Sequence, residues 1–443
     1  MSKEKLSRRD FLRWVAVAGA GALLASCAPA TTKPTEEAPE EGPGATESVT
    51  VTWWNPDSLQ WQPAYEAIAK LVMDNNPDIT VEIGNVPEEG FQEKILSMIA
   101  GGTAPDVWTW YYAVDYYRHG VIQELDEFLD GAGIDPEKLW FQICNLRGSY
   151  QGKRYGVPRD AFFTGIIYNL DLFDEFGVAY PEEGWTLNDF LDRATALTDE
   201  EKGTWGTTIG GPAALAFDQA LCWNTNFEIV SEDGRQVKGL LDSPDSIWAI
   251  QWVIDLEVKH KVSPPTGMTQ QLGDWPFASG QVGMASGQAA IDMLKSLTFR
   301  FDQLGAPVKP GIDPHSWGDS VQYHMWSGSP NKEAAWKLME TASSVEGSTL
   351  AMSIAWLSPC PEAWIKAGMD QDPLTRPMWL ESQKPTQVPN YLRTEYHWDC
   401  VWPEYEGIFT RYIENNERPL DKLVQEAAEN AQKCLDERYA ENP

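Results

Sequence analysis

Short apolar segments and amphipathic stretches alternate along the first regular part of the chain. Val49–Trp54 is an apolar segment that predicts a strand. A helix is expected from Pro63, because a proline is tolerated in the first turn, where its missing N–H has no partner anyway. Ile79–Ile83 alternates as a strand, Phe91–Ala100 has helical spacing, and Pro105–Trp110 is the next strand. This β-α-β-α-β order predicts an α/β fold with a parallel sheet and right-handed crossovers.

Aromatic residues gather where two of these predicted strands end. Trp54 and Asn55 close the first strand, and the run Trp108–Tyr112 closes the third. In open sheets of this kind, ligands bind beyond the carboxyl ends of the strands. Both strands therefore deliver aromatic side chains to one rim, and we expect Trp54, Asn55, Trp110 and Tyr111 to contact a ligand there.

The first residues have the features of an export signal. Arg8 and Arg9 precede an apolar run over Trp14–Ala25, which is too short for a true membrane span. The arginine pair resembles the twin-arginine export signal, and Leu24–Cys27 resembles the lipobox of bacterial lipoproteins. We therefore expect residues 1–26 to be a signal peptide and Cys27 to receive a lipid. The alternative is an ordinary signal with an incidental cysteine.

Residues 27–48 predict a lipidated cysteine followed by a disordered tether. Beyond Cys27 the segment contains Ala, Pro, Thr, Glu and Gly but no large apolar residue. Its root-mean-square reach is about 25 Å, from roughly 5–6 Å times the square root of the residue number. The protein body would thus be held outside the cell at the outer face of the membrane.

Composition excludes some broad classes of protein. The 443 residues include 34 Lys+Arg and 66 Asp+Glu, for a net charge of −32. This balance argues against nucleic acid as a partner, because polyphosphate recognition needs a cationic surface. Hydrophobic residues are 42% and the mean hydropathy is −0.39, which excludes a protein that spans the membrane many times.

The cysteines and histidines indicate no metal site and no cofactor. Five cysteines remain after Cys27, so at least one is unpaired within the chain. A disulfide between Cys360 and Cys400 is one candidate pairing, whereas Cys434 lies on the apolar stripe of a C-terminal helix and is expected to be a buried small hydrophobe. The chain has no C-x-x-C, and its 5 histidines lack the spacing of metal ligands.

Several short motifs follow one another further along the chain: Gly152–Asp160, Gly165–Phe173, Gly184–Phe190, Phe277–Met284, Ser329–Met339 and Ser343–Gly347. Their set and order resemble family 1 extracellular solute-binding proteins of ABC importers, the class that includes maltose-binding protein. The resemblance covers nearly all of residues 49–438. Its most specific piece, Pro158–Glu175, fits the family signature except at Arg159, where an apolar residue is usual. Ser286–Ala289 also departs, because the family often has Gly-Pro-Trp there.

The resemblance implies a two-lobe periplasmic-binding-protein fold of type II, with a ligand cleft between lobes that the chain crosses three times. By resemblance the crossings fall near residues 157–163, 284–290 and 343–350. The first lobe would comprise residues 49–158 with 288–345, and the second 159–287 with 346–443. Such a protein is a monomer without catalytic activity, and it presents its ligand to the membrane subunits of an ABC importer. Only a different affinity for the open and closed states can drive closure.

Carbohydrate is the ligand class that the aromatic residues favour. An aromatic plane stacks on the C–H face of a sugar, and Asp, Asn or Arg side chains bond its hydroxyls. At the first crossing we select Arg159 and Asp160. Arg159 either pairs with an acidic residue or points into the cleft, where it would favour an anionic sugar. The remaining candidates are tryptophans of the second lobe and of later rims, Trp223, Trp275, Trp326 and Trp356, the last because the family places a ligand-facing loop just before its Leu-x-Pro turn.

A secreted glycoside hydrolase is the alternative function. With 66 acidic residues, pairs of carboxylates will occur by chance, so composition does not exclude this enzyme class. The body lacks the H-E-x-x-H, G-x-S-x-G, P-loop and Rossmann motifs. A binding protein predicts tight binding without turnover, whereas a hydrolase predicts product release.

Overall fold

The computed structural model describes residues 48–56, 61–211, 219–265, 268, 270–273, 275–287 and 291–441, all within the unit Glu47–Pro443. Arg8, Arg9, Cys27 and the predicted tether lie outside the described residues. Among the described helices, none is both long enough and apolar enough to cross a membrane.

The first sheet has five strands in the order β2-β1-β3-β13-β6. Its strands are β1 (Val49–Asn55), β2 (Ile79–Asn85), β3 (Val107–Trp110), β6 (Val157–Pro158) and β13 (Gln322–Met325). Strand β1 pairs in parallel with both β2 and β3, which confirms the parallel sheet expected from the apolar pattern. Strand β13 runs antiparallel to β3 and β6, so it begins at the edge where they end.

Helices from two distant parts of the chain pack on this sheet. Helix α2 contacts β2, α15 and α16, and α16 also contacts α17. The buried residues of α2, from Ala64 to Val72, lie at helical spacing on one face. The helices of this part are α2 (Gln62–Asn75), α3 (Phe91–Ala100), α4 (Val114–Tyr117), α5 (Asp126–Ala132), α6 (Pro136–Leu139), α7 (Gln142–Gly148), α15 (Lys332–Ser343), α16 (Val345–Met352) and α17 (Pro361–Ala367), with a short hairpin of β4 (Ser149–Tyr150) and β5 (Lys153–Arg154).

The second sheet has four strands in the order β11-β8-β10-β9. Its strands are β8 (Ile166–Asn169), β9 (Trp205–Thr207), β10 (Val282–Ser286) and β11 (Phe301–Leu304). The helices that follow these strands or pack near them are α8 (Leu170–Phe176), α9 (Leu187–Leu197), α11 (Gln219–Asn224), α12 (Pro244–Val258), η2 (Gln270–Leu272), η3 (Pro276–Ser279) and α14 (Ile291–Ser296). A C-terminal group contains α18 (Arg376–Ser382), η4 (Asn390–Leu392), η5 (His397–Val401), α19 (Trp402–Phe409), η6 (Thr410–Glu414) and α20 (Leu420–Glu441).

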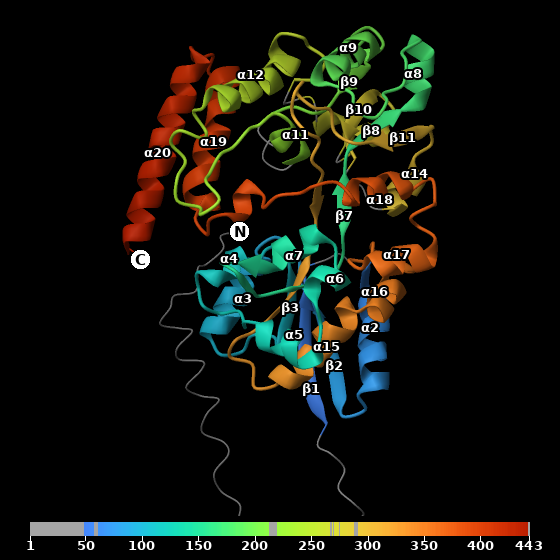
Figure 1. Cartoon of the computed structure of the whole chain (residues 1–443), viewed down its shortest axis with the longest axis vertical. Coiled ribbons are helices and arrows are strands. Elements are labelled where there is room, and N and C mark those ends of the chain that lie inside the picture. The colour runs from blue at the N-terminus through green and yellow to red at the C-terminus, as the bar shows by residue number, and fades with distance from the viewer. Residues whose placement is uncertain are drawn as a thin grey trace, which may run out of the picture. The chain divides into compact units, whose positions relative to one another are not determined.

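A two-stranded ribbon connects the two sheets. Strand β7 (Phe162–Thr164) follows β6, precedes β8, and pairs antiparallel with β12 (Trp317–Asp319). Figure 1 shows β7 running between the two sheets. Residues 157–163, where the first crossing was expected, contain β6 and the beginning of β7.

The other two predicted crossings do not match the strand pairing. Strands β10 and β11 both pair with β8, so residues 284–286 and 301–304 belong to the second sheet and the chain returns through β12. The predicted division had assigned 288–345 to the first lobe. Helices α15 and α16 contact each other and α2, so residues 343–350 remain beside the first sheet. In both cases contacts between segments distant in the sequence place the residues in a different part of the fold from the one that the motif order had suggested.

The disulfide also differs from the prediction. Cys400 in η5 is bonded to Cys434 in α20, with their Cα atoms 5.4 Å apart. Cys360 is a buried free thiol in the core of the first sheet, whereas Cys400 lies in the core beside the C-terminal helices. Cys360 and Cys400 therefore belong to different cores, and Cys434 is a disulfide partner as well as part of an apolar stripe. Cys144 is a second buried free thiol, and the side chain of Cys222 lies outside the described residues.

Candidate functional site

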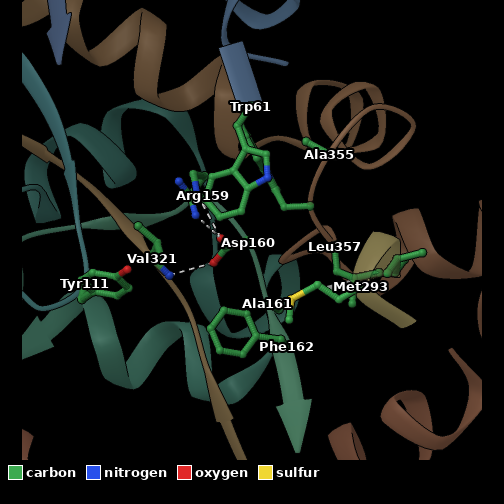
Figure 2. A pocket seen from close by; sticks show the side chains of 12 residues that line it. Trp61, Tyr111, Arg159, Asp160, Ala161, Phe162, Met293, Val321, Ala355 and Leu357 are labelled. Atoms are coloured by element: carbon green, nitrogen blue, oxygen red, sulfur yellow. Dashed lines mark hydrogen bonds and ion pairs between the residues drawn. The ribbon is translucent and has the colours of Figure 1, made fainter. Parts of the chain in front are cut away.

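A cavity of about 240 Å³ lies at the edge of the first sheet where β3 and β6 end (Figure 2). Most of its wall comes from segments next to the first sheet. Helix α14, which lies in the chain between β10 and β11 of the second sheet, also contributes to it. The lining residues are Trp61 before α2, Tyr111 after β3, Arg159, Asp160, Ala161 and Phe162 after β6, Ile291 and Met293 in α14, Val321 before β13, and Ala355, Trp356 and Leu357 after α16.

The strand ends explain why these residues meet. The hydroxyl of Thr109 donates to Oδ1 of Asn55 at 2.6 Å, which joins the ends of β1 and β3. Gln322 lies opposite both Trp110 and Pro158, so β6 ends and β13 begins at the same edge. The cavity thus opens at the carboxyl edge of the parallel strands, where the sequence had placed the ligand.

Arg159 is buried, with 2% of its surface exposed, and its guanidinium contacts both hydrogen-bond acceptors and aromatic rings. Its Nη1 donates to the hydroxyl of Tyr65 at 2.6 Å, and its Nε and Nη2 donate to one oxygen of Asp160 at 2.9 and 2.8 Å. The guanidinium carbon lies 4.9 Å from the ring centre of Trp61 and 4.7 Å from that of Trp356. Both rings attract the cation through the negative charge of their faces.

Asp160 completes the bonding of Arg159 and ties two strands together. Its Oδ2 accepts the two Arg159 bonds, and its Oδ1 accepts the backbone N–H of Val321 at 2.7 Å. The hydroxyl of Ser320 donates to the backbone oxygen of Asp160 at 2.6 Å. The acidic partner of Arg159 is therefore its own neighbour in the chain, and the pair adds no net charge to the cavity wall.

Trp356 lines the cavity and carries a buried polar atom. Only 7% of its surface is exposed, and its Nε1 has no hydrogen-bond partner among the residues that the structure describes. The ring lies 5.1 Å from Tyr65 and 6.2 Å from Trp61, measured between centroids. A buried donor without a partner costs free energy, which an acceptor on a bound molecule would recover.

A second buried arginine pairs with an aspartate of the two-stranded ribbon. Arg147 in α7 pairs with Asp319 of β12 at 2.8 Å and also bonds the hydroxyl of Tyr391. Its guanidinium lies 4.9 Å from the ring of Tyr112 and 4.8 Å from that of Tyr391. Burial raises the pKa of Asp319 to about 6, although the charge of Arg147 opposes this shift. Trp398, which is 36% exposed, lies against Tyr391 with the ring centroids 6.4 Å apart.

Four of the ten predicted ligand-binding residues line the cavity, namely Tyr111, Arg159, Asp160 and Trp356. Trp54 and Trp110 lie elsewhere. Successive residues of a strand point to opposite faces, and Trp54 packs beneath Lys94, whose Nζ is 4.9 Å from the ring centre. Trp110 stacks on Phe91 with the ring centroids 5.4 Å apart.

The other four predicted residues are not brought to the cavity. Asn55 is buried at the end of β1 and bonded to Thr109. Trp326 follows β13, and its backbone N–H bonds Asp106 just before β3, so it lies at the opposite end of these strands. Trp223 is buried in the core of the second sheet, and Trp275 packs against Phe277 with the ring centroids 5.8 Å apart.

Sequence reasoning missed several aromatic residues of this region. Trp61 and Phe162 line the cavity, while Tyr112 and Trp398 flank Tyr391 near Arg147. The position of Trp61, just before a helix that follows the first strand, was a usable signal because helix starts in α/β folds face the same edge as strand ends. Within the described residues, no group of three or more His, Cys, Asp or Glu side chains is placed to hold a metal ion.

Similarity to known proteins extends over most of the described chain. Residues 55–348 match the family described as bacterial extracellular solute-binding protein, and residues 5–25 match the twin-arginine translocation signal. A Brucella abortus protein named as a binding protein is 25% identical over 299 residues, 64% of this chain and 69% of the relative. An Escherichia coli protein named as an ABC transporter periplasmic-binding protein is 21% identical over 235 residues, 51% of this chain and 52% of the relative.

Solved structures share the fold. A Listeria monocytogenes ABC substrate-binding protein in complex with cycloalternan has a TM-score of 0.72 at 23% identity, covering 88% of this chain and 100% of that one. A Thermotoga lettingae solute-binding protein bound with α-D-tagatose has a TM-score of 0.70 at 19% identity, with coverage of 88% and 100%. The sugar-binding protein MalE of Xanthomonas citri has a TM-score of 0.71 at 16% identity, with coverage of 88% and 98%. The predicted two-lobe fold of type II is confirmed.

Proposed function

Because this chain belongs to the bacterial extracellular solute-binding proteins of ABC transporters, we propose that it captures a carbohydrate outside the cytoplasm and delivers it to the membrane subunits of an importer. The family consists of binding proteins, so the proposed activity is capture without turnover. The ligand enters the cavity at the carboxyl edge of the first sheet. Closure of the two sheet-bearing lobes around it is the signal that the importer reads.

The observation that carries the proposal is an aromatic cavity wall without net charge. Trp61, Tyr111 and Trp356 supply aromatic side chains to the wall, and aromatic side chains are the groups that pack against the C–H surface of a sugar. The charges of Arg159 and Asp160 cancel, so the wall favours a neutral ligand over an acidic sugar. Structural relatives were solved with cycloalternan and with α-D-tagatose, which supports the same ligand class.

We further propose that a lipid on Cys27 anchors the protein to the outer face of the cell membrane. The support is the cysteine that directly follows Leu24-Ala25-Ser26, at the end of a twin-arginine signal. Replacing it, C27A, should move the protein from the membrane fraction to the soluble extracytoplasmic fraction without changing ligand affinity. Retention of the C27A protein in the membrane fraction would contradict the lipid anchor.

The test of the function is a thermal-shift screen of the purified protein against sugars, oligosaccharides, uronic acids, polyols and polyamines. A ligand at 100 times its Kd stabilises the folded state by about 2.7 kcal/mol, a shift that is easily seen. A neutral sugar that stabilises the protein and is recovered intact after long incubation is the expected result. A sugar that is consumed would favour a glycoside hydrolase, and a panel without any carbohydrate hit would refute the proposal.

A further inference from the structure

The two ends of the cavity differ in their chemistry. Tyr111, Arg159 and Asp160 form one end, whereas Met293, Ala355 and Leu357 form the other (Figure 2). Ile291 adds a further aliphatic side chain from α14. None of the four side chains Ile291, Met293, Ala355 and Leu357 carries a nitrogen or oxygen that can bond a hydroxyl.

A plain sugar does not match the aliphatic end. Leu357 is 6% exposed and Met293 is 37% exposed, so a hydroxyl that displaces water from this end finds no side-chain partner in return, which is unfavourable. An apolar group gains free energy in the same place because its surface leaves water. The wall is therefore suited to a molecule with one polar face and one apolar appendage.

We propose that the solute is a neutral glycoside whose apolar aglycone, aryl or alkyl, enters the aliphatic end formed by Met293, Leu357, Ala355 and Ile291. The inference rests on the proposed carbohydrate-binding function and specifies its substrate class. The sugar ring faces Tyr111 and the Arg159–Asp160 pair. The aglycone then lies beyond Phe162, toward α14.

Cavity size is consistent with this occupant. A buried apolar cavity of about 150 Å³ holds a benzene molecule. The cavity here measures about 240 Å³, which accommodates one aromatic ring with the atoms that join it to a sugar. The sugar ring, at the end formed by Tyr111 and the Arg159–Asp160 pair, would extend from there into the opening between the segments that line the cavity.

Trp356 is a second lining residue whose chemistry bears on the ligand. Its buried Nε1 has no partner among the described residues, although the ring packs against Tyr65 and Trp61. A glycosidic or ring oxygen is an acceptor without a charge and would satisfy this donor. An ammonium group would not, because it has no lone pair to accept the bond.

The experiment compares methyl and phenyl glycosides of the same sugars by isothermal titration calorimetry with the purified protein. Glucose, galactose, mannose and xylose provide four matched pairs. The extra apolar surface of the phenyl group predicts at least about tenfold tighter binding than the methyl glycoside of the sugar that binds. Equal affinities for the two members of that pair would overturn the inference while the carbohydrate function stands. If no glycoside and no free sugar binds, the proposed function falls and the inference with it.

One variant and a matched control locate the effect. M293Q places an amide in the aliphatic end and should reduce the phenyl-to-methyl affinity ratio to below about threefold. I365Q removes a similar apolar side chain that is 56% exposed on α17 and outside the cavity wall, and should leave the ratio unchanged. A ratio that survives M293Q, or that falls equally in I365Q, would overturn the placement of the aglycone.

W356F tests the donor separately. Phenylalanine keeps an aromatic ring but removes Nε1, so both the methyl and the phenyl glycoside should bind about two- to tenfold more weakly. The ratio between them should change little, because the lost bond is common to both. Unchanged affinity for both glycosides would overturn the assigned role of Trp356 Nε1.

Discussion

Arg159 and Arg147 are two buried arginines in similar surroundings, yet their aspartate partners are bonded to different extents. Each guanidinium pairs with an aspartate and lies between two aromatic rings. Asp160 accepts two N–H groups of Arg159 and the backbone N–H of Val321. Asp319 accepts from one Arg147 nitrogen and from the backbone of Ser320. The Nε and Nη1 of Arg147 have no hydrogen-bond partner within the described part of the chain.

The difference in bonding decides whether each buried ion pair stabilises or destabilises the folded state. A buried ion pair offsets its loss of hydration only when the remaining donors and acceptors are satisfied. Asp160 meets that condition and ties the end of β6 to the start of β13, so it holds the cavity wall in place. The Arg147–Asp319 pair does not, because Nε and Nη1 of Arg147 lack partners among the described residues, and burial raises the pKa of Asp319 to about 6. The same pair of residue types therefore acts as a rigid support in one place and as a titratable group in the other.

The largest expected effect comes from breaking the better-bonded pair. D160N leaves the Arg159 cation buried without a counter-charge, which should lower the free energy of unfolding by about 3–5 kcal/mol. Urea unfolding of the wild type and the variant at pH 7 measures this. D192N, which replaces an exposed aspartate on α9, is the control and should be close to wild type. A loss below about 1 kcal/mol for D160N would mean that Arg159 finds other partners.

The second largest effect is a pH-dependent loss of stability caused by His397, which lies near Arg147. His397 packs against Tyr391, and burial lowers its pKa from 6.5 to about 3. The neutral ring is therefore favoured by folding, and this contribution is present above pH 6.5 and lost as the pH falls toward 3. Between pH 7.5 and 5 the wild type should lose about 2 kcal/mol relative to H397F, which cannot take up a proton. Parallel stability curves for the two proteins over this range would contradict the assigned burial of His397.

The ligand could bind beside Arg159 or beside Arg147, and one substitution near each arginine distinguishes the two sites. W61A removes one ring from Arg159 and from the cavity wall, and should weaken binding of the sugar found by screening about tenfold. Y112A removes the corresponding ring from Arg147 and should change the affinity less than about threefold. Titration calorimetry of both variants decides between the two sides. The opposite ranking would place the ligand beside Tyr112 and Trp398, on the Arg147 side.

Local and nearly local patterns made the first sheet and its binding edge predictable. The apolar run of β1, the alternation in β2, Pro63 at the start of α2, and the rule that ligands bind at strand ends all act within a β-α-β unit. The second crossing differs because the pairing of β11 with β8 joins residues more than 130 positions apart, as in Asp302 opposite Tyr168. The third differs because α16 packs against the distant helix α2. Nothing in the local pattern encodes such a pairing. Likewise, the sequence offered an acidic partner as one role for Arg159, but only the three-dimensional arrangement shows Trp61 and Trp356 beside it.

The smallest effect has the opposite sign to that of His397 and isolates Asp319. Its pKa in the folded state, about 6, lies above the ordinary value of 3.8, so folding favours the protonated acid. The resulting stability is complete below pH 3.8 and is lost as the pH rises through 6. Relative to D319N, the wild type should therefore gain about 1 kcal/mol between pH 7 and pH 5. Chemical denaturation of the two proteins at both pH values measures the difference.

Because His397 acts in the reverse direction over the same interval, the measurement on Asp319 is cleanest in an H397F background. There the H397F protein is compared with the H397F/D319N double variant at pH 7 and pH 5. A stability difference that grows toward pH 5 in favour of the H397F protein is expected, since only that protein can take up the proton on Asp319. A difference that stays constant would show that Arg147 holds the Asp319 carboxylate ionised as firmly as Arg159 holds Asp160, and the contrast between the two pairs would disappear.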